Sequence, residues 1–427
     1  MNLLIKNVHA IDINLDEITD ILIQDGKIAK MEKNICAECA EIERIIDGTG
    51  LVAMPSLFDM HVHFRDPGQT HKEDIISGCC SALAGGVTGV LCMPNTNPPV
   101  DSPEILNYIL EKAKNTGVAV YPVACITKGM QGENLTDFAE LKNSGAKCLS
   151  DDGRPVKNAE LMRLALEKSK QENILIASHC EDLDIINGGI MHKGSVSEEL
   201  GVKGMDRASE DYITAREIIL ASSCNSRIHI CHVSTKGSVD IIREAKRLGV
   251  QVTCETAPHY FMLTHEKLKS RNANDRMNPP LREESDRQAI EQAVLDGTID
   301  CIVTDHAPHA PEEKADFEHA PNGIVGLETS LSATLTALYH TGKCSLQQII
   351  AMMSVRPREI LNIPVVCLKE NADANLILVD LNQKWEVIPE KLNSKSHNTA
   401  FRNMTLIGKV KFTISDGIIR YEYEKNK

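Results

Sequence analysis

Short apolar segments alternate with longer amphipathic segments between about residues 51 and 362, and this pattern constrains the fold more than any other feature. Such alternation indicates repeated βα units and a parallel sheet. Eight segments are candidate strands: 57–63, 87–93, 118–125, 146–150, 174–179, 227–232, 250–255 and 300–305. Eight units are typical of a closed (β/α)8 barrel of the TIM type, whereas an open doubly wound sheet usually has fewer strands.

Both ends of the chain have the pattern of β structure. Strand candidates lie at 3–10, 20–24 and 27–31, with a hairpin turn at Asp25-Gly26, and further candidates lie at 374–380 and 409–415. We therefore predict an α/β fold with three parts in sequence. Residues 1–53 and 364–427 form one small, discontinuous β-sandwich domain, and residues 54–363 form the barrel, which carries the active site.

Composition excludes several classes of function. The net charge of −14 and the lack of a Lys/Arg-rich run argue against nucleic acid as a partner, because neutralising phosphates requires clustered cations. No stretch approaches the roughly 18 uncharged residues of a membrane span, and the N-terminus lacks the features of a signal peptide. The 14 cysteines are scattered, and the Cys36/Cys39 pair has no second pair at zinc-ribbon spacing. We expect a cytoplasmic protein and interpret this pair as incidental surface thiols.

Histidine and aspartate residues recur at the C-terminal ends of the candidate strands, where barrels of this type place their chemistry. His61 and His63 close the first strand on one face, because side chains alternate along a strand. A single histidine pair is often only a partly buried polar patch. However, other strands also end in residues that bind metals, and the full set is His61, His63, Asp152, His179, His232 and Asp305.

Four imidazoles and two carboxylates exceed the ligand set of one tetrahedral zinc ion and suit two ions bridged by a carboxylate and a hydroxide. Zn²⁺ is the expected metal, although Mn²⁺ or Co²⁺ would suit the same ligands. Two ions lower the pKa of a shared water from about 15.7 toward 7. Asp305 is the candidate general acid/base for attack on an amide carbonyl, with ligation alone as its alternative role. His259, at the end of the seventh strand, is interpreted as a hydrogen-bonding neighbour of the ligands.

Seven short motifs resemble those of the bacterial type I dihydroorotases in the amidohydrolase superfamily. They are DMHVHFRDPG from Asp59, MPNT from Met93, DDG from Asp151, HCED from His179, HVSTKG from His232, MNPPLR from Met277 and TDHAPH from Thr304. Each motif alone is weak, but their order along the whole chain is specific. The resemblance implies reversible cyclisation of N-carbamoyl-L-aspartate to L-dihydroorotate in de novo pyrimidine (UMP) biosynthesis.

The resemblance implies the same six ligands, holding two Zn²⁺ per subunit that are bridged by Asp152 and hydroxide. Many cyclic amidohydrolases use a carboxylated lysine as the bridge, but the fourth strand here ends in Asp151-Asp152. Asp152 is our choice and Asp151 the alternative. The substrate residues implied are His63, Arg65, Asn95, Asn278 and His309, together with the backbone of Asn322 and Gly323 on a closing loop.

Dihydroorotate is an anion, and the guanidinium of Arg65 has a planar fork that matches a carboxylate. Two positions depart from the family pattern: Asp66 stands where glutamate is common, and Asn322 stands where phenylalanine is frequent. We expect both departures to affect mainly loop packing.

Two other functions compete with this interpretation. Hydantoinases (dihydropyrimidinases) and allantoinases resemble this fold but cleave rings without the carboxylate, so Arg65 and Asn278 argue against them. A non-catalytic barrel scaffold would have lost ligands, yet all six are present. The family also leads us to expect a homodimer and an association with aspartate carbamoyltransferase.

Overall fold

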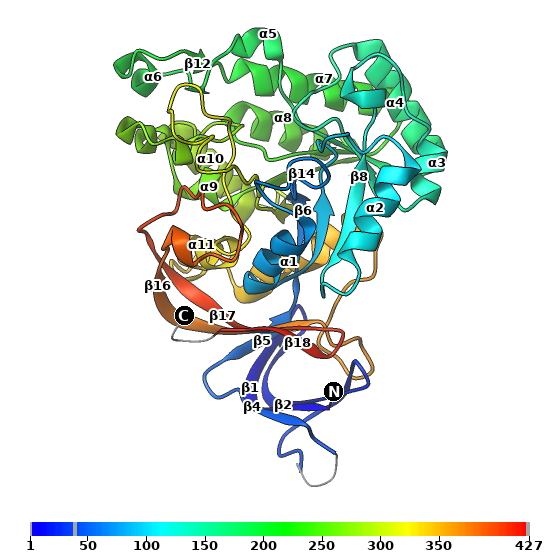
Figure 1. Ribbon diagram of the computed structural model, residues 1–427, viewed down its shortest axis with the longest axis vertical. Coiled ribbons are helices and arrows are strands. Elements are labelled where there is room, and N and C mark those ends of the chain that lie inside the picture. The colour runs from blue at the N-terminus through cyan, green and yellow to red at the C-terminus, as the bar shows by residue number, and fades with distance from the viewer. Residues whose placement is uncertain (1, 37–40, 424–427) are drawn as a thin grey trace.

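The computed structural model describes residues 2–36 and 41–423, and it places a barrel beside a smaller β sheet (Figure 1). The barrel strands pair in parallel in the order in which they occur along the chain. They are β6 (Leu57–Val62), β7 (Val87–Cys92), β8 (Ala119–Ala124), β9 (Cys148–Leu149), β10 (Leu175–Ser178), β13 (Ile228–Ile230), β14 (Val252–Thr256) and β15 (Cys301–Ile302). A parallel bridge between Val62 and His306 joins the segment after β15 to β6. The ring is thereby closed, and the predicted (β/α)8 barrel is confirmed.

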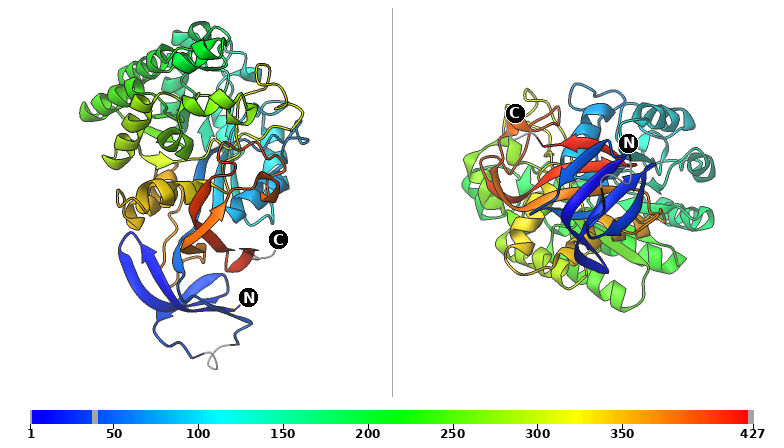
Figure 2. Two further views of the ribbon diagram at one scale, coloured as in Figure 1. Left: turned by 90° about the vertical axis from the view of Figure 1, so that its left-hand side faces the viewer. Right: turned by 90° about the horizontal axis from the view of Figure 1, so that it is seen from below.

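Helices form the outer layer of the barrel (Figure 2). The principal ones are α1 (Ile75–Ala84), α2 (Pro103–Ala113), α3 (Phe138–Asn143), α4 (Ala159–Glu172), α7 (Ala208–Cys224), α8 (Lys236–Arg247), α10 (Glu284–Leu295) and α11 (Ser330–Thr334). Local sequence sets their ends: the Asn158 side chain caps α4 by accepting from the amides of Glu160 and Leu161. In α8, Val239, Ile242 and Ala245 form the buried face that packs toward the strands.

Strands from both ends of the chain build the smaller sheet. They are β1 (Leu3–Asp12), β2 (Leu15–Gln24), β3 (Lys27–Glu32), β4 (Arg44–Asp47), β5 (Val52–Pro55), β16 (Leu376–Glu386), β17 (Thr405–Ser415) and β18 (Ile418–Glu422). β5 pairs with β16 in antiparallel register, with Ala53 opposite Leu378, and this pairing joins the two termini. The sheet encloses its own apolar core, which includes Ile5, Ile21 and Leu376. The predicted discontinuous β domain is confirmed, with its strands hydrogen-bonded into one sheet in place of the two sheets that a sandwich implies. Its exact limits at residues 53 and 364 stay a prediction.

Two further expectations concern the surface. None of the helices in the described part of the chain is long and apolar enough to cross a membrane. Cys36 is exposed. Its motif partner Cys39 lies outside the described residues, so the interpretation of this pair as surface thiols stays a prediction.

Candidate metal centre and active site

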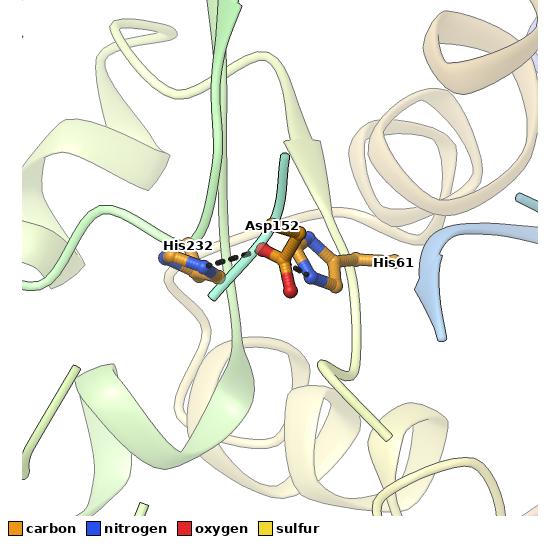
Figure 3. A group of neighbouring side chains, drawn as sticks. All are labelled: His61, Asp152 and His232. Atoms are coloured by element: carbon orange, nitrogen blue, oxygen red, sulfur yellow. Dashed lines mark ion pairs between the residues drawn. The ribbon is translucent and has the colours of Figure 1, made fainter. Parts of the chain in front are cut away.

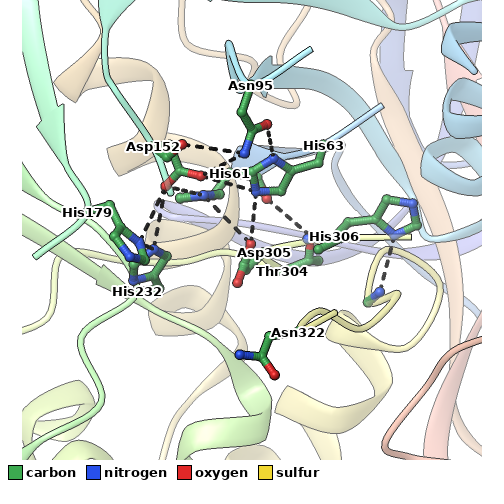
Figure 4. Close-up of polar contacts among 12 residues, drawn as sticks. His61, His63, Asn95, Asp152, His179, His232, Thr304, Asp305, His306 and Asn322 are labelled. Carbon is green, nitrogen blue, oxygen red and sulfur yellow. Dashed lines mark hydrogen bonds and ion pairs between the residues drawn. The ribbon is translucent and has the colours of Figure 1, made fainter. Parts of the chain in front are cut away.

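The structure brings all six predicted metal ligands together at the C-terminal ends of the barrel strands (Figure 4). All six side chains are buried; the most exposed, Asp305, keeps 6% of its surface accessible. Two of them, His232 and Asp305, have positive φ angles of 33° and 49°. Such conformations are unfavourable for residues other than glycine, and they persist where the surrounding structure enforces them, often at functional sites.

Asp152 lies at the centre of the cluster, between imidazoles from other strands (Figure 3). Its Oδ1 atom is 3.4 Å from His61 Nε2, 3.6 Å from His179 Nδ1 and 3.7 Å from His232 Nε2. Its Oδ2 atom is 3.5 Å from His63 Nε2. The carboxylate therefore has one oxygen toward His61, His179 and His232 and the other toward His63, so it contacts all four imidazoles of the cluster.

The cluster has the properties of a cation site. His61 Nε2 and Asp152 Oδ1 are buried without a hydrogen-bond partner, although buried polar atoms normally have one. His61, His63 and Asp305 place one donor atom each within 4.8 Å of one another, and so do His61, Asp152 and His232. Imidazole nitrogen and carboxylate oxygen are donors that divalent transition metals accept. The residues present therefore fit a metal.

Outer partners orient several of these imidazoles. Three such pairs occur: His61 Nδ1 with Glu255 Oε1 at 2.7 Å, His63 Nδ1 with Asn95 Oδ1 at 2.8 Å and His179 Nε2 with Glu181 Oε2 at 3.3 Å. Each acceptor holds a proton on the outward nitrogen, so the inward nitrogen keeps its lone pair for a metal. His232 differs, because its Nδ1 is buried without a partner.

Glu255 is a site residue that the sequence analysis missed. It belongs to β14 and is fully buried. Its second oxygen lies 3.1 Å from His229 Nε2. Burial disfavours the charged carboxylate, but His61 and His229 hold the pKa of Glu255 well below its usual value. Its position at the end of a barrel strand was the only signal for it in the sequence.

We expect Glu255→Gln to weaken metal binding by about 10- to 100-fold, because the amide no longer supplies an anionic acceptor to His61. Competition with a chromogenic chelator measures this affinity. Glu244→Gln is the matched control, since Glu244 lies on the surface of α8 and pairs with Arg247. Unchanged metal affinity in Glu255→Gln would show that Glu255 does not orient His61.

The two adjacent aspartates of the fourth strand point in different directions. Asp151 accepts from the backbone amides of Ile126 and Thr127 at 2.8 Å and 3.1 Å. Burial raises the pKa of Asp151 to about 6. Its carboxylate is thus engaged with the loop after β8, whereas that of Asp152 faces the imidazoles. This arrangement favours Asp152 over Asp151 as the bridge.

A cavity of about 200 Å³ opens beside the cluster. Every predicted substrate residue lines it: His63, Arg65, Asn95, Asn278, His309, Asn322 and Gly323. Arg65 is 8% exposed, and its Nε donates to the carbonyl of Pro308 at 3.2 Å. Arg65 has no ion pair with any acidic side chain in the described part of the chain. Its charge is therefore available to an anionic ligand.

His309 completes this wall of the cavity as a neutral group. Its Nε2 lies 2.9 Å from the carbonyl of Asn322, so this nitrogen carries the proton and donates it. Burial and the nearby charge of Arg65 lower the pKa of His309 to about 2. Arg65 supplies the positive charge at this wall, and the single ring proton of His309 is held by the Asn322 carbonyl.

Asn278 connects the cavity to the metal ligands. Its Nδ2 donates to Glu181 Oε1 at 2.9 Å, and Glu181 in turn holds His179. The two positions that depart from the family pattern differ in their contacts, since Asp66 binds helix α2 and Asn322 binds another loop. Asp66 binds Tyr108 and Lys112, and the Asn322 side chain accepts from Arg276.

The hydrogen-bonding role predicted for His259 is not seen. Its ring is 2% exposed, and Nε2 is buried without a hydrogen-bond partner. The ring instead packs edge-on against Tyr260, with 4.1 Å between the ring centroids. Burial lowers the pKa of His259 to about 4. His259 is thus a buried ring that makes no side-chain hydrogen bond among the described residues.

Comparisons with known proteins show what this chain resembles over its length. Residues 50–238 match the family described as Dihydro-orotase-like. Relatives named dihydroorotase include one from Citrifermentans bemidjiense, 47% identical over 99% of this chain and 100% of the relative. Another, from Trichlorobacter lovleyi, is 48% identical over 98% of this chain and 99% of the relative.

Solved structures with the same fold include an L-hydantoinase (dihydropyrimidinase) from Arthrobacter aurescens. Its TM-score is 0.85 at 23% identity, and the match covers 98% of this chain and 95% of that one. A dihydropyrimidinase from Brevibacillus agri gives the same TM-score and coverage at 21% identity. At these identities the likeness concerns the fold alone.

Proposed function

Because the chain belongs to the dihydroorotase family, we propose that it interconverts N-carbamoyl-L-aspartate and L-dihydroorotate in pyrimidine biosynthesis. The observation that carries this proposal is the buried Arg65 guanidinium, which pairs with no acidic side chain of the described residues and lies on the wall of a cavity that also contains the metal cluster. A substrate with a carboxylate beside a cyclic amide would satisfy both features at once. The full-length similarity to proteins named dihydroorotase supports the same substrate.

We further propose that the centre holds two Zn²⁺ ions, with Asp152 shared between them. His61, His63 and Asp305 would serve one ion, and His179 and His232 the other. When bound, such ions polarise a carbonyl group and make water nucleophilic near neutral pH. The protein side chains hold this chemistry in a buried site, where competing water is restricted.

Asp305 is the proposed general acid/base. Burial disfavours its charge, but hydrogen bonding to His63 at 3.2 Å and the neighbouring imidazoles lower the pKa of Asp305. The carboxylate is therefore ionised and can accept the proton of attacking water. As the carbon–oxygen bond forms and the ring carbon–nitrogen bond breaks, Asp305 returns the proton to the leaving nitrogen. Cyclisation follows the same path in reverse.

Arg65 orients the substrate through its carboxylate, and neutral His309, whose Nε2 proton is donated to the Asn322 carbonyl, forms part of the same wall. We place the enzyme in the cytoplasm. Buried cysteines such as Cys79, Cys148 and Cys254 are unpaired thiols, as expected where cellular reductants act.

The test is hydrolysis of L-dihydroorotate by purified protein, run beside hydantoin, dihydrouracil and allantoin. Each assay is repeated after chelation and after return of Zn²⁺, Mn²⁺ or Co²⁺. We expect activity on dihydroorotate alone, lost on chelation and restored by metal, with Zn²⁺ present in the protein as purified. Preference for an uncharged ring would assign a hydantoinase-type activity instead. No activity with metal bound would indicate a scaffold.

A further inference from the structure

A short segment from the C-terminal part of the chain contacts the loops that line the substrate cavity. Residues 393–398, here called the strap, lie between β16 and β17. Ser394, Ser396 and Asn398 are each at most 3% exposed. Ser396 Oγ donates to the carbonyl of Lys72 at 2.6 Å, and Ser394 binds Glu73. The strap is thus attached to the loop that follows β6 and carries Arg65.

Asn398 attaches the same strap to the loop that follows β15. Its Oδ1 accepts from the amide of His309 at 3.1 Å. Its Nδ2 donates to the carbonyls of Ala307 at 3.1 Å and Gly323 at 2.9 Å. One side-chain amide therefore uses both of its hydrogens and its oxygen to hold residues 307–309 against Gly323.

The parts of the loop held by Asn398 form the wall at which the carboxylate is proposed to bind. The carbonyl of Pro308 accepts from Arg65 Nε, and His309 Nε2 donates to the carbonyl of Asn322. The fit is close, since a Cβ at Gly323 would lie 2.8 Å from the Ala307 carbonyl oxygen. A shift of this wall would therefore move Arg65 and His309 relative to each other.

We propose that Asn398 is a positioning residue for binding of the substrate carboxylate. It lies outside the lining of the cavity and acts through the backbone of Ala307, His309 and Gly323. Its amide sets the position of the Pro308 carbonyl and of the His309 ring, and thereby of the Arg65 guanidinium that would bind the anion. This inference rests on the function proposed above, because it takes the ligand to be a carboxylate.

The decisive variant is Asn398→Asp, which preserves the shape of the side chain. One carboxylate oxygen still accepts from His309, but the other faces two carbonyl oxygens and repels them. Asn398→Ser removes the same donors without adding charge and decides the question if the aspartate variant does not fold. Asn393→Ser is the matched control: Asn393 Nδ2 binds Glu328 at the other end of the strap, away from the cavity.

We expect the KM for L-dihydroorotate to rise about tenfold or more in both Asn398 variants, with kcat changed by less than about threefold. Binding of orotate, the dehydrogenated analogue that retains the carboxylate, is measured by calorimetry on the metal-loaded protein. It should weaken by a similar factor. Asn393→Ser should leave the KM and orotate affinity near wild-type values even where its melting temperature falls.

The two readouts separate this inference from the proposed function. Wild-type protein that binds orotate but does not hydrolyse dihydroorotate would contradict the function, while weaker orotate binding in the Asn398 variants would still support positioning. An active wild type with unchanged KM and orotate affinity in these variants would overturn the inference. Equal losses in the Asn393 and Asn398 variants would also overturn it, because they would indicate a merely structural role. Wild-type protein that does not bind orotate would also overturn the inference, because the inference takes the ligand at this wall to be a carboxylate.

Discussion

Asp305→Asn is expected to lower kcat for L-dihydroorotate by about 1,000-fold or more. The carboxamide keeps the shape of Asp305 but cannot accept a proton from attacking water or return it to the leaving nitrogen. Steady-state kinetics in both directions, with metal analysis of the same samples, measures the effect. Because Asp305 also lies among the metal ligands, samples that retain full metal content isolate its role in proton transfer.

Asp240→Asn is the matched control for this substitution. Asp240 is an exposed residue of α8 that pairs with Lys236 and Arg243 at the surface, and its replacement should leave kcat unchanged. Circular dichroism and thermal melting establish that both variants are folded. A near-normal kcat in Asp305→Asn would show that Asp305 is not the general acid/base. Its remaining role would then be metal ligation alone.

Arg65→Gln is expected to lower kcat/KM for L-dihydroorotate by about 100-fold or more, mainly through a higher KM. The guanidinium is buried and has no acidic partner within the described chain, so its loss leaves the substrate carboxylate without a counter-charge in a desolvated pocket. Arg65→Lys keeps the charge but loses the planar fork, and an intermediate loss is expected. Initial-rate kinetics with the wild type, Arg65→Gln and Arg65→Lys measures kcat/KM for each protein.

The Arg65 series also tests substrate choice. Any activity on dihydrouracil, which has no carboxylate, should change much less in Arg65→Gln than activity on dihydroorotate. If Arg65→Gln left the kinetics with dihydroorotate unchanged, the assignment of Arg65 to the substrate carboxylate would be wrong. The same wall would then have to bind a different part of the substrate.

The tertiary structure was needed to find the residues that support the site. Glu255 contacts His61 across 194 positions of sequence, and Asn398 contacts His309 across 89. Neither residue lies in a pattern that signals its partner. Asn398 in particular occurs in a polar stretch that looks like an ordinary loop. Long-range hydrogen bonds of this kind depend on how the loops pack, which local periodicity does not describe.

What the sequence alone determined follows from local regularities. The alternation of strands and helices predicted the barrel, and the residue types at strand ends predicted which side chains would meet, because all parallel strands end on the same face. The choice between Asp151 and Asp152 shows the limit of such reasoning. The two residues are adjacent and chemically identical, so only the folded chain decides which one the amides of Ile126 and Thr127 bind and which one faces the imidazoles.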